Sequence, residues 1–293
     1  MTRQKFSCPG KINLFLKVTG RRPDGYHELD TLFVPLACPA DELEFAPSAA
    51  PGEITFACPA FPGAGQDNLV VKAARRFAEV SGIGACWDFV LHKKIPVAAG
   101  LGGGSSDAAA ALAALNGYYG VFSPAELRDI AVKIGADVPF FLDALPARAQ
   151  GVGEKLETLP ELKDFPEVMI LFPGFPVSAK WAYQHLAPEH IGGVPPQHSE
   201  MLAKVAAGAA GVDDYVSLVH NDLAFALYEK FPLLGMLKEF IMANGAMAVE
   251  VSGSGSSLFA LFEKGSAVRC AGALRESYFN NPMLRIFASG SEL

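Results

Sequence analysis

Apolar and polar residues alternate along the start of the chain with the two-residue period of a β-strand. Every second residue from 12 to 18 is apolar, within a strand expected over 6–18, and a second such stretch covers 29–36. Between them, residues 21–25 read Arg-Arg-Pro-Asp-Gly, which is a strong turn signal. This pattern predicts a β-hairpin with a long tip.

A helical period follows, with Leu69, Ala73, Phe77 and Val80 on one face of a helix over 69–80 that residues 66–68 can cap. A second helix begins at the capping box Ser-Pro-Ala-Glu of residues 123–126 and runs to 134. The other expected elements are strands over 41–45, 53–57, 87–91, 168–172, 247–251 and 258–262, and helices over 201–207, 223–228, 232–243 and 267–279.

The pattern of elements is interrupted between residues 156 and 166 by two prolines and several charges, which predicts a domain boundary. We expect one domain over 1–160 and a second over 161–293. The second half mixes strands and helices around a small sheet, as an α+β domain does. Residues 188–198 are rich in proline and glycine, and they predict a mobile loop.

Composition sets limits on the class of protein. Of the 293 residues, 51% are hydrophobic and 19% charged, which is enough apolar material for packed cores. A net charge of −7 argues against a general nucleic-acid or membrane-surface binder, although it allows a nucleotide ligand. The five cysteines include no C-x-x-C pair, and no apolar run approaches the ~20 residues of a membrane span. We therefore expect a soluble, cytoplasmic protein without a disulfide framework or structural zinc.

A glycine-rich stretch over 96–111 reads PVAAGLGGGSSDAAAA. Its alanine-rich tail favours a helix, so the stretch predicts a loop leading into a first helical turn, with Ser105 or Ser106 near the cap. A helix N-terminus presents unpaired N–H groups and positive dipole charge, and glycines before it let a bulky anion approach the backbone. The stretch therefore predicts a phosphate-binding loop.

Other glycine-rich loops fit this stretch less well. The P-loop pattern requires a lysine that is absent here, and G-x-G-x-x-G fails because the sixth position from Gly100 is Ser105. A flexible linker is the remaining alternative. We disfavour it because a linker seldom runs straight into an alanine-rich helix.

Four further motifs each have an ordinary structural explanation. Lys11 and Asn13 lie on the same face of the first strand, where a lysine is usually a solvated charge. The motif Arg22-Pro-Asp-Gly-Tyr-His27 places a histidine after a turn, which is usually surface decoration. Asp137 in Gly-Ala-Asp-Val-Pro suits a turn, and residues 252–256, Ser-Gly-Ser-Gly-Ser, suit a hairpin turn.

Taken together, the motifs resemble the signatures of the GHMP small-molecule kinases. Residues 96–109 are similar to the second signature, P-x-x-x-G-L-G-[GS]-S-[SA]-[AS]; residues 9–13 and 252–256 resemble the first and third. The resemblance extends from Cys8 to about Lys264. It implies an α+β fold of two domains, a ribosomal-protein-like N-terminal α/β domain and a ferredoxin-like C-terminal domain, with the active site in the cleft between them.

The motifs R-x-D-G-[YF]-H and G-[AS]-D-V-P are specific to one branch of the family. This resemblance implies transfer of the γ-phosphate of ATP to the 2-hydroxyl of cytidine diphosphate methylerythritol, in isoprenoid precursor biosynthesis. Mg²⁺ is expected with the nucleotide, with no motif fixing its ligands, and neither nucleic acid nor membrane is an expected partner.

The resemblance also assigns roles to individual residues. Lys11 and Asp137 are the implied catalytic residues, with Lys11 near the transferred phosphate and Asp137 accepting the proton of the attacking hydroxyl. Asn13 lies near the acceptor alcohol, and Tyr26 and His27 contact the cytidine base. The implied ATP-binding residues are Pro96, Val97, Ala98, Ala99, Gly100, Leu101, Gly102, Gly103, Gly104, Ser105 and Ser106.

Two rival functions stay open. One is a GHMP kinase for another alcohol, such as mevalonate or homoserine, against which Tyr26 and His27 argue. The other is a relative that binds a nucleotide or sugar without turnover, against which Lys11 and Asp137 argue. The chain also departs from the family pattern at three places, which are Ala179 where threonine is common, Asp143-Ala-Leu-Pro where glycine is usual, and Ser256 where proline or a small residue is common.

Overall fold

The computed structural model describes residues 3–48, 52–63, 65, 67–191, 196–277 and 279–293. The chain forms two compact units built from interleaved segments. Unit 1 comprises Met1–Gly10, Ala40–Ile95 and Gly102–Ala144, and unit 2 comprises Lys11–Pro39, Pro96–Leu101 and Leu145–Leu293. The two-domain division at residue 160 stays a prediction.

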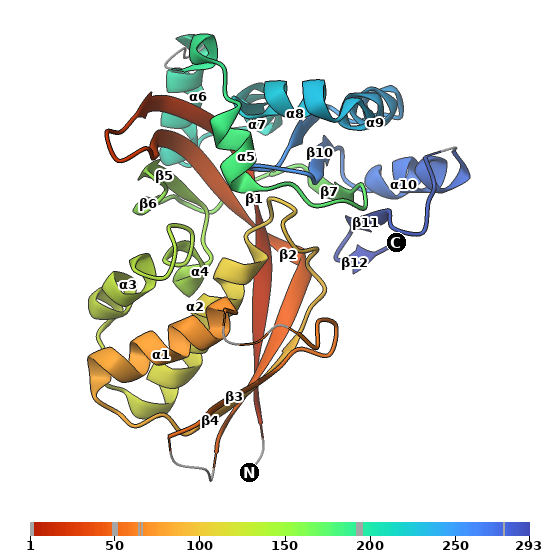
Figure 1. Cartoon of the computed structure of the whole chain (residues 1–293). Helices are drawn as coiled ribbons and strands as arrows, with labels where there is room; N and C mark the ends of the chain where they lie inside the picture. The colour runs from red at the N-terminus through yellow and green to blue at the C-terminus, as the bar shows by residue number, and fades with distance from the viewer. Residues whose placement is uncertain (1–2, 49–51, 64, 66, 192–195, 278) are drawn as a thin grey trace. The chain divides into compact units, whose positions relative to one another are not determined.

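The secondary structure mixes strands and helices, as the sequence predicts for an α+β fold (Figure 1). The strands are β1 (Gln4–Arg21), β2 (His27–Pro47), β3 (Ile54–Ala57), β4 (Trp87–His92), β5 (Ala147–Gly151), β6 (Lys155–Thr158), β7 (Glu167–Phe172), β8 (His220–Asn221), β9 (Ala248–Val251), β10 (Leu258–Phe262), β11 (Arg285–Ala288) and β12 (Ser291–Glu292). The helices are α1 (Leu69–Ser81), α2 (Gly103–Tyr119), α3 (Pro124–Val132), α4 (Phe140–Asp143), α5 (Ala179–Gln184), the 3₁₀ turn η1 (Pro188–His190), α6 (Pro196–Ala206), α7 (Val212–Leu218), α8 (Ala224–Lys230), α9 (Pro232–Ala243) and α10 (Ala267–Glu276).

Unit 1 holds one end of the long strands β1 and β2, and its strands are ordered β3-β4-β2-β1. Strand β3 runs parallel to β4, while β4 runs antiparallel to the end of β2. Helix α1 packs on α2, which also contacts α3 and α4. Phe77 of α1 and Trp87 of β4 are both fully buried in edge-to-face contact, so the helices and the sheet share one core.

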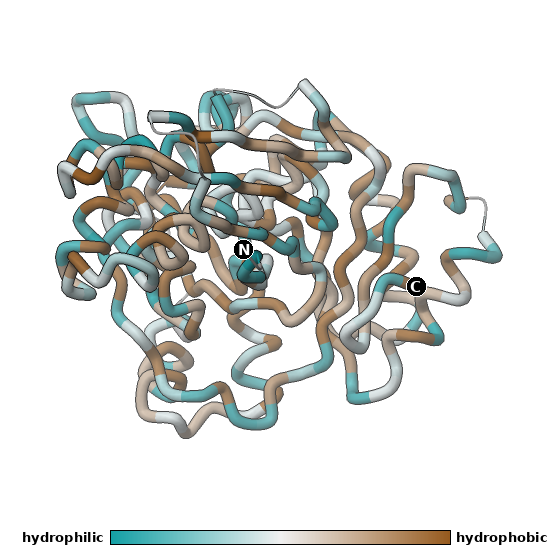
Figure 2. Tube along the Cα trace, turned by 90° about the horizontal axis from the view of Figure 1, so that it is seen from below, coloured by the Kyte–Doolittle hydropathy of each residue, from teal (hydrophilic) through white to brown (hydrophobic). Residues whose placement is uncertain are grey.

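Unit 2 contains the other end of β1 and β2, with β5 paired to β2, β6 paired to β5 and β8 beside β1. A second sheet lies wholly in this unit, in the order β12-β11-β7-β10-β9 with antiparallel neighbours. Leu171, Val251 and Phe262 of this sheet are buried in one cluster with Leu237 of α9 and Leu274 of α10. Apolar and polar stretches alternate along the trace (Figure 2).

Short-range predictions match the structure well. Asn68 caps α1 by accepting a hydrogen bond from the Val70 N–H, and Ser123 forms the predicted capping box with Glu126. The buried face of α1 includes Ala73 and Phe77, whereas Val80 is exposed. None of the helices in the described part of the chain is long and apolar enough to cross a membrane.

Several expectations need correction. The strand expected over 41–45 is not separate, because β2 continues through it, and α3 ends at Val132, short of residue 134. The mobile loop predicted over 188–198 contains η1 and the start of α6. Some predicted elements include residues that the structure does not describe: Gln66 in the cap over 66–68, residues 192–195 in the loop over 188–198 and Tyr278 in the helix over 267–279.

Candidate active site

Lys11 and Asn13 meet the glycine-rich loop inside unit 2. The Lys11 ammonium donates to the Asn13 Oδ1 at 2.6 Å and to the Gly100 carbonyl oxygen at 3.2 Å. Asn13 is held in turn by its amide, which donates to the Thr31 hydroxyl at 2.8 Å. Lys11 is only 4% exposed, so the ordinary explanation of a lysine in this position, a solvated charge, does not apply to it. A buried ammonium with fixed acceptors is a charge held in one place.

The third motif reaches the same carbonyl. The Ser252 hydroxyl donates to the Gly100 oxygen at 3.0 Å. A Cβ at Gly253 would lie 3.1 Å from Asn13 Oδ1 and 3.4 Å from the Lys11 ammonium. Gly100 itself has φ +78°, and a Cβ there would overlap the Ser252 carbonyl oxygen. The turn at 252–256 therefore does more than join β9 to β10, because it closes around the first two motifs.

The loop before α2 is fixed by its carbonyl groups. Ala98 accepts from the Val177 N–H at 3.0 Å, and Ala99 accepts from the Ser257 N–H at 3.1 Å. Leu101 accepts from the Lys11 N–H at 2.9 Å, so four successive carbonyls, including that of Gly100, are bonded within unit 2. A backbone tied at four consecutive residues is not a flexible linker.

Helix α2 begins earlier than predicted. Its N-cap is Gly102, with a left-handed φ of 72°, so Ser105 and Ser106 lie inside the first turns rather than at the cap. Glycine has no side chain that could accept a capping hydrogen bond, so the first N–H groups of the helix are left for another acceptor. Ser106 Oγ is buried and has no hydrogen-bond partner among the described residues. These features suit an anion at this helix end.

A buried charged cluster lies beneath the start of α2 in unit 1. The Lys93 ammonium bonds both the Asp41 carboxylate and Asp107, the latter at 2.8 Å. Asp41 also accepts the N–H groups of Lys94 at 2.5 Å and Ile95 at 2.8 Å. Burial raises the pKa of Asp107 to about 7; attraction to Lys93 opposes this shift and repulsion from Asp41 adds to it.

This cluster was not predicted from the sequence. A Cβ at Gly103 would lie 2.9 Å from Ile95 Cγ2 and 3.2 Å from the Lys93 ammonium, so the cluster packs directly against the first residue of α2. The available signal was the pair Lys93-Lys94 just before the loop and Asp107 just after it. Asp41 comes from a distant strand, and no local pattern connects it to the loop.

His27 is the first residue of β2 in unit 2, and Tyr26 directly precedes it. The His27 ring stacks on Tyr183 of α5, with ring centroids 5.3 Å apart and planes inclined by 21°. Burial and, less strongly, the charge of Arg21 lower the pKa of His27, which favours the neutral ring. Tyr26 is 65% exposed. Tyr183 was missed from the sequence, because it lies in a helix far along the chain.

Asp137 lies in unit 1, half-buried in the turn before α4. The turn itself is closed by the Val138 N–H, which donates to the Gly135 carbonyl at 3.1 Å. Lys11 belongs to unit 2, so the expected pairing of the two residues stays a prediction. Of the positions that depart from the family pattern, Asp143 forms an ion pair with Arg128 at 2.6 Å, and Ala179 is the first residue of α5 after the Ser178 cap.

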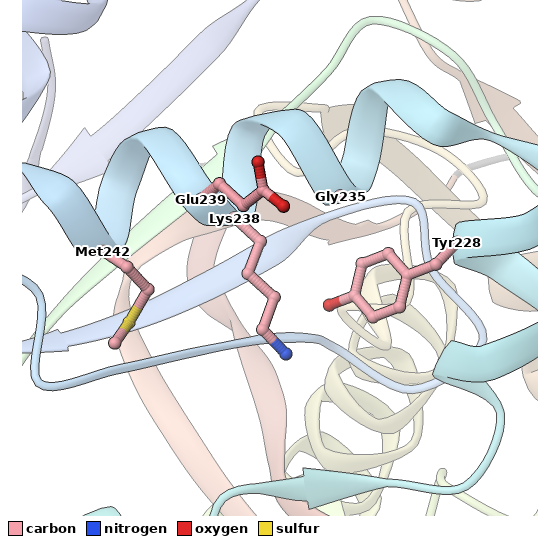
Figure 3. Close-up of a pocket in the computed structure, with 5 residues that line it drawn as sticks. All are labelled: Tyr228, Gly235, Lys238, Glu239 and Met242. Atoms are coloured by element: carbon pink, nitrogen blue, oxygen red, sulfur yellow. The ribbon is translucent and has the colours of Figure 1, made fainter.

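A separate open pocket of about 460 Å³ lies on α8 and α9 of unit 2 and contains none of the predicted site residues (Figure 3). Lys238 lies over the Tyr228 ring at 5.1 Å, and Glu239 points away from it. Tyr228 and Lys238 both donate to the buried Glu250, at 2.5 and 2.9 Å. These groups satisfy one another, as structural polar networks do.

Two family models match the chain. The model of the GHMP kinase N-terminal domain matches residues 68–144, and the model of the GHMP kinase C-terminal domain matches residues 212–280. A solved homoserine kinase from Cytophaga hutchinsonii shares the fold, with a TM-score of 0.74 at 19% identity, covering 100% of this chain and 96% of its own. With the relatives described next, these matches show that the chain belongs to the GHMP kinase family. It is a small-molecule kinase, and ATP is the co-substrate of such an enzyme.

Within the family, the chain is similar to 4-diphosphocytidyl-2-C-methyl-D-erythritol kinases. The enzyme of Syntrophotalea carbinolica is 38% identical over 276 residues, which are 92% of each chain. That of Geobacter sulfurreducens is 37% identical over 284 residues, covering 94% of this chain and 96% of its own. A crystal structure of 4-(cytidine 5'-diphospho)-2C-methyl-D-erythritol kinase matches with a TM-score of 0.77 at 36% identity, covering 97% and 98%.

Proposed function

We propose that the protein transfers the γ-phosphate of ATP to the 2-hydroxyl of 4-diphosphocytidyl-2-C-methyl-D-erythritol, in the cytoplasm, as a step of the non-mevalonate route to isoprenoid precursors. The relatives that share 37–38% identity over most of the chain carry this activity in their names. The observation that carries the choice of acceptor is the stack of His27 on Tyr183. A pair of stacked rings suits an acceptor that carries a nucleobase, whereas mevalonate and homoserine have no ring to contact it.

ATP would bind at residues 96–106. The four bonded carbonyls of the loop turn oxygen atoms toward the protein, and the uncapped start of α2 offers N–H groups and positive dipole charge to the phosphates. Gly104 is exposed at this helix end, so its backbone is open to a bulky anion. The Ser105 and Ser106 hydroxyls would add to these backbone donors.

The nucleotide would bring Mg²⁺, which prefers oxygen ligands. Ser106 Oγ and Asp107 Oδ1 are buried without a hydrogen-bond partner among the described residues, and both follow the loop directly. These oxygens fit the ion, and Ser106 is the residue that we expect to hold it. When bound, the ion would offset negative charge on the phosphates.

The chemical step would depend on Lys11 and Asp137. Asp137 would accept the proton of the attacking hydroxyl, since an alcohol is a poor nucleophile at neutral pH. Lys11 would stabilise charge on the transferring phosphoryl group, and its bonds to Asn13 and Gly100 hold the ammonium ready for that role. Such transfer relies on positioning and charge more than on covalent help.

The cytidine base would be bound by aromatic side chains. A neutral histidine offers one donor and one acceptor to the polar edge of a pyrimidine, and Tyr26 and Tyr183 offer aromatic faces for stacking. Asn13, whose side chain is fixed by Thr31, would lie at the acceptor alcohol.

An ADP-release assay with three acceptors tests the proposal. The purified protein is incubated with Mg²⁺, ATP and either 4-diphosphocytidyl-2-C-methyl-D-erythritol, mevalonate or homoserine, and a reaction without acceptor serves as the control. We expect turnover with the first acceptor alone. Turnover with mevalonate or homoserine in its place would assign a different alcohol, and nucleotide binding without turnover of any acceptor would assign a binding protein.

A further inference from the structure

Asn221, at the end of β8, is a buried residue that no motif brought to attention. It is 2% exposed. Its amide donates to the Val251 carbonyl at 2.8 Å and to the Gly253 carbonyl at 2.7 Å, while its Oδ1 accepts from the Leu223 N–H at 2.9 Å. One side chain therefore fixes both sides of the residue Ser252, whose hydroxyl bonds the Gly100 carbonyl.

The backbone beside Asn221 is tied to the strand that carries Lys11. Residue 221 pairs in parallel register with Leu16 of β1, and the Asp222 N–H donates to the Leu16 carbonyl at 3.0 Å. The Asp222 carboxylate accepts the Val18 N–H at 2.7 Å. Residues 221 and 222 thus connect β1 to the glycine turn at 252–256, because Asp222 bonds the main chain of β1 and the Asn221 side chain bonds the main chain of the turn.

This connection sets the distance between two parts of the site. Gly253 has φ +54°, and a Cβ there would come within 3.1 Å of Asn13 Oδ1, so the turn has little free space on that side. A shift of the turn would change the hydrogen bond from Ser252 to Gly100 and the room around the Lys11 ammonium. The Asn221 amide donates to the carbonyls on either side of Ser252, so it opposes such a shift at the residue that bonds Gly100.

We propose that Asn221 is a positioning residue for phosphoryl transfer, holding the glycine turn at 252–256 in register with Lys11 and Gly100. The inference rests on the proposed function, because it assigns the turn and Lys11 to the phosphate site. Asn221 itself acts through the turn and touches no reacting atom. Loss of its amide lowers kcat, since misplacement of about 1 Å can cost roughly 10²-fold in rate.

The test compares Asn221→Ala with a matched structural control. Asn116 also bonds a backbone segment with both ends of its amide, donating to the Phe122 carbonyl and accepting its N–H, each at 2.9 Å. It does so at the opposite end of α2 from the glycine loop. Asn116→Ala therefore removes a similar pair of bonds without touching the turn at 252–256.

Melting temperature, kcat and the two KM values are measured for the wild type and both variants, at a temperature where all are folded. We expect a similar loss of melting temperature in both, with kcat reduced by roughly 10²-fold in Asn221→Ala and nearly unchanged in Asn116→Ala. Asn221→Ser, which keeps one donor for two carbonyls, gives an intermediate kcat and decides the question where the alanine variant does not fold.

Two results would overturn the proposal. One is an Asn221 variant that is folded and turns over within about threefold of the wild type, and the other is an equal loss of kcat in Asn116→Ala. Failure of the proposed function looks different, because the wild type would then turn over none of the cytidine-bearing acceptor. Wild-type turnover therefore separates the two questions before any variant is compared.

Discussion

The ammonium group of Lys11 donates a hydrogen bond to the carbonyl oxygen of Gly100, 89 residues further along the chain. The same oxygen accepts the hydroxyl of Ser252. Three motifs that are separate in the sequence thus share one oxygen atom, and each constrains where the others lie. Lys11 is a buried cation with a fixed position, as a group that stabilises charge in a transition state must be.

Replacing Lys11 by methionine keeps the length and apolar packing of the side chain and removes the charge. We expect kcat to fall by roughly 10²- to 10³-fold, the loss typical of one preorganised electrostatic contact. Lys5→Met is the matched control, because Lys5 lies on the same strand but is exposed and pairs with Glu42. An ADP-release assay on both variants checks this, and equal activity of the two would remove Lys11 from the catalytic residues.

Asp137→Asn keeps the shape of the side chain but removes a base. The expected loss in kcat is about 10²- to 10⁴-fold with little change in KM. If Asp137 only stabilises the turn in which it lies, the variant instead has a lower melting temperature and an unchanged kcat, so both quantities are measured on the same protein. Combining the change with Lys11→Met should cost less than the product of the single losses, because residues that act together are not additive.

Gly104→Ala tests the phosphate loop, because the change should leave the protein at least as stable but weaken its binding of ATP. Gly104 lies exposed in the first turn of α2, and an added Cβ would lie 3.3 Å from Leu69 Cδ1 and within 4 Å of no other side chain of the described residues. Alanine favours the helix by up to about 1 kcal/mol, so melting temperature should hold or rise. The same methyl group should obstruct the phosphates and raise the KM for ATP several-fold. Unchanged ATP affinity by calorimetry would contradict a phosphate site here. Gly103 is a poorer choice, because its Cβ would displace Ile95.

His27→Ala should weaken binding of the cytidine-bearing acceptor by about 1–3 kcal/mol, the cost of leaving a polar partner unsatisfied. The KM for ATP should not change. Tyr183→Phe keeps the ring that stacks on His27 and serves as the control. Titration with cytidine and uridine diphosphates measures the effect, and equal affinity of the wild-type protein for both would exclude base selection by His27.

Asp107→Asn should change how stability depends on pH. The pKa of Asp107 rises from an ordinary 3.8 to about 7 on folding, so the folded state favours the protonated carboxyl. Its contribution is complete below the unfolded pKa and is lost as pH rises through about 7. Asparagine cannot ionise, so the stability of the variant relative to the wild type should increase with pH over this range, by at most about 1.4 kcal/mol per pH unit. Urea unfolding of both proteins between about pH 5 and 8 measures the difference. A constant difference would show that Asp107 does not titrate there.

The features that sequence reasoning predicted are local ones. Asn68 and Ser123 each cap a helix through atoms within three residues, so the evidence for each cap lies in a few neighbouring letters. The glycine loop is equally local, although its helix begins two residues before Ser105, because Gly102 adopts a left-handed backbone.

The features that were missed depend on distant segments. Tyr183 contacts His27 from a helix more than 150 residues further along the chain, and Asp41 bonds Lys93 from a distant strand. The burial of Lys11 was missed for a related reason. A lysine in isolation is expected in water, and its burial here depends on distant partners such as the Gly100 carbonyl, which accepts a hydrogen bond from the ammonium.

The bonded carbonyls of residues 98–101 also bear on how this loop can vary between sequences. The groups that donate hydrogen bonds to these carbonyls contact main-chain atoms, which any residue has. The side chains of Val97 and Ala98 are exposed. The hydrogen bonds of the loop thus place no constraint on the side chains at those two positions, and Ala98, with φ +52°, could become glycine at no steric cost. Gly100 has no such freedom, because any side chain there collides with Ser252. A lineage that exchanges one acceptor alcohol for another can therefore leave this loop as it is.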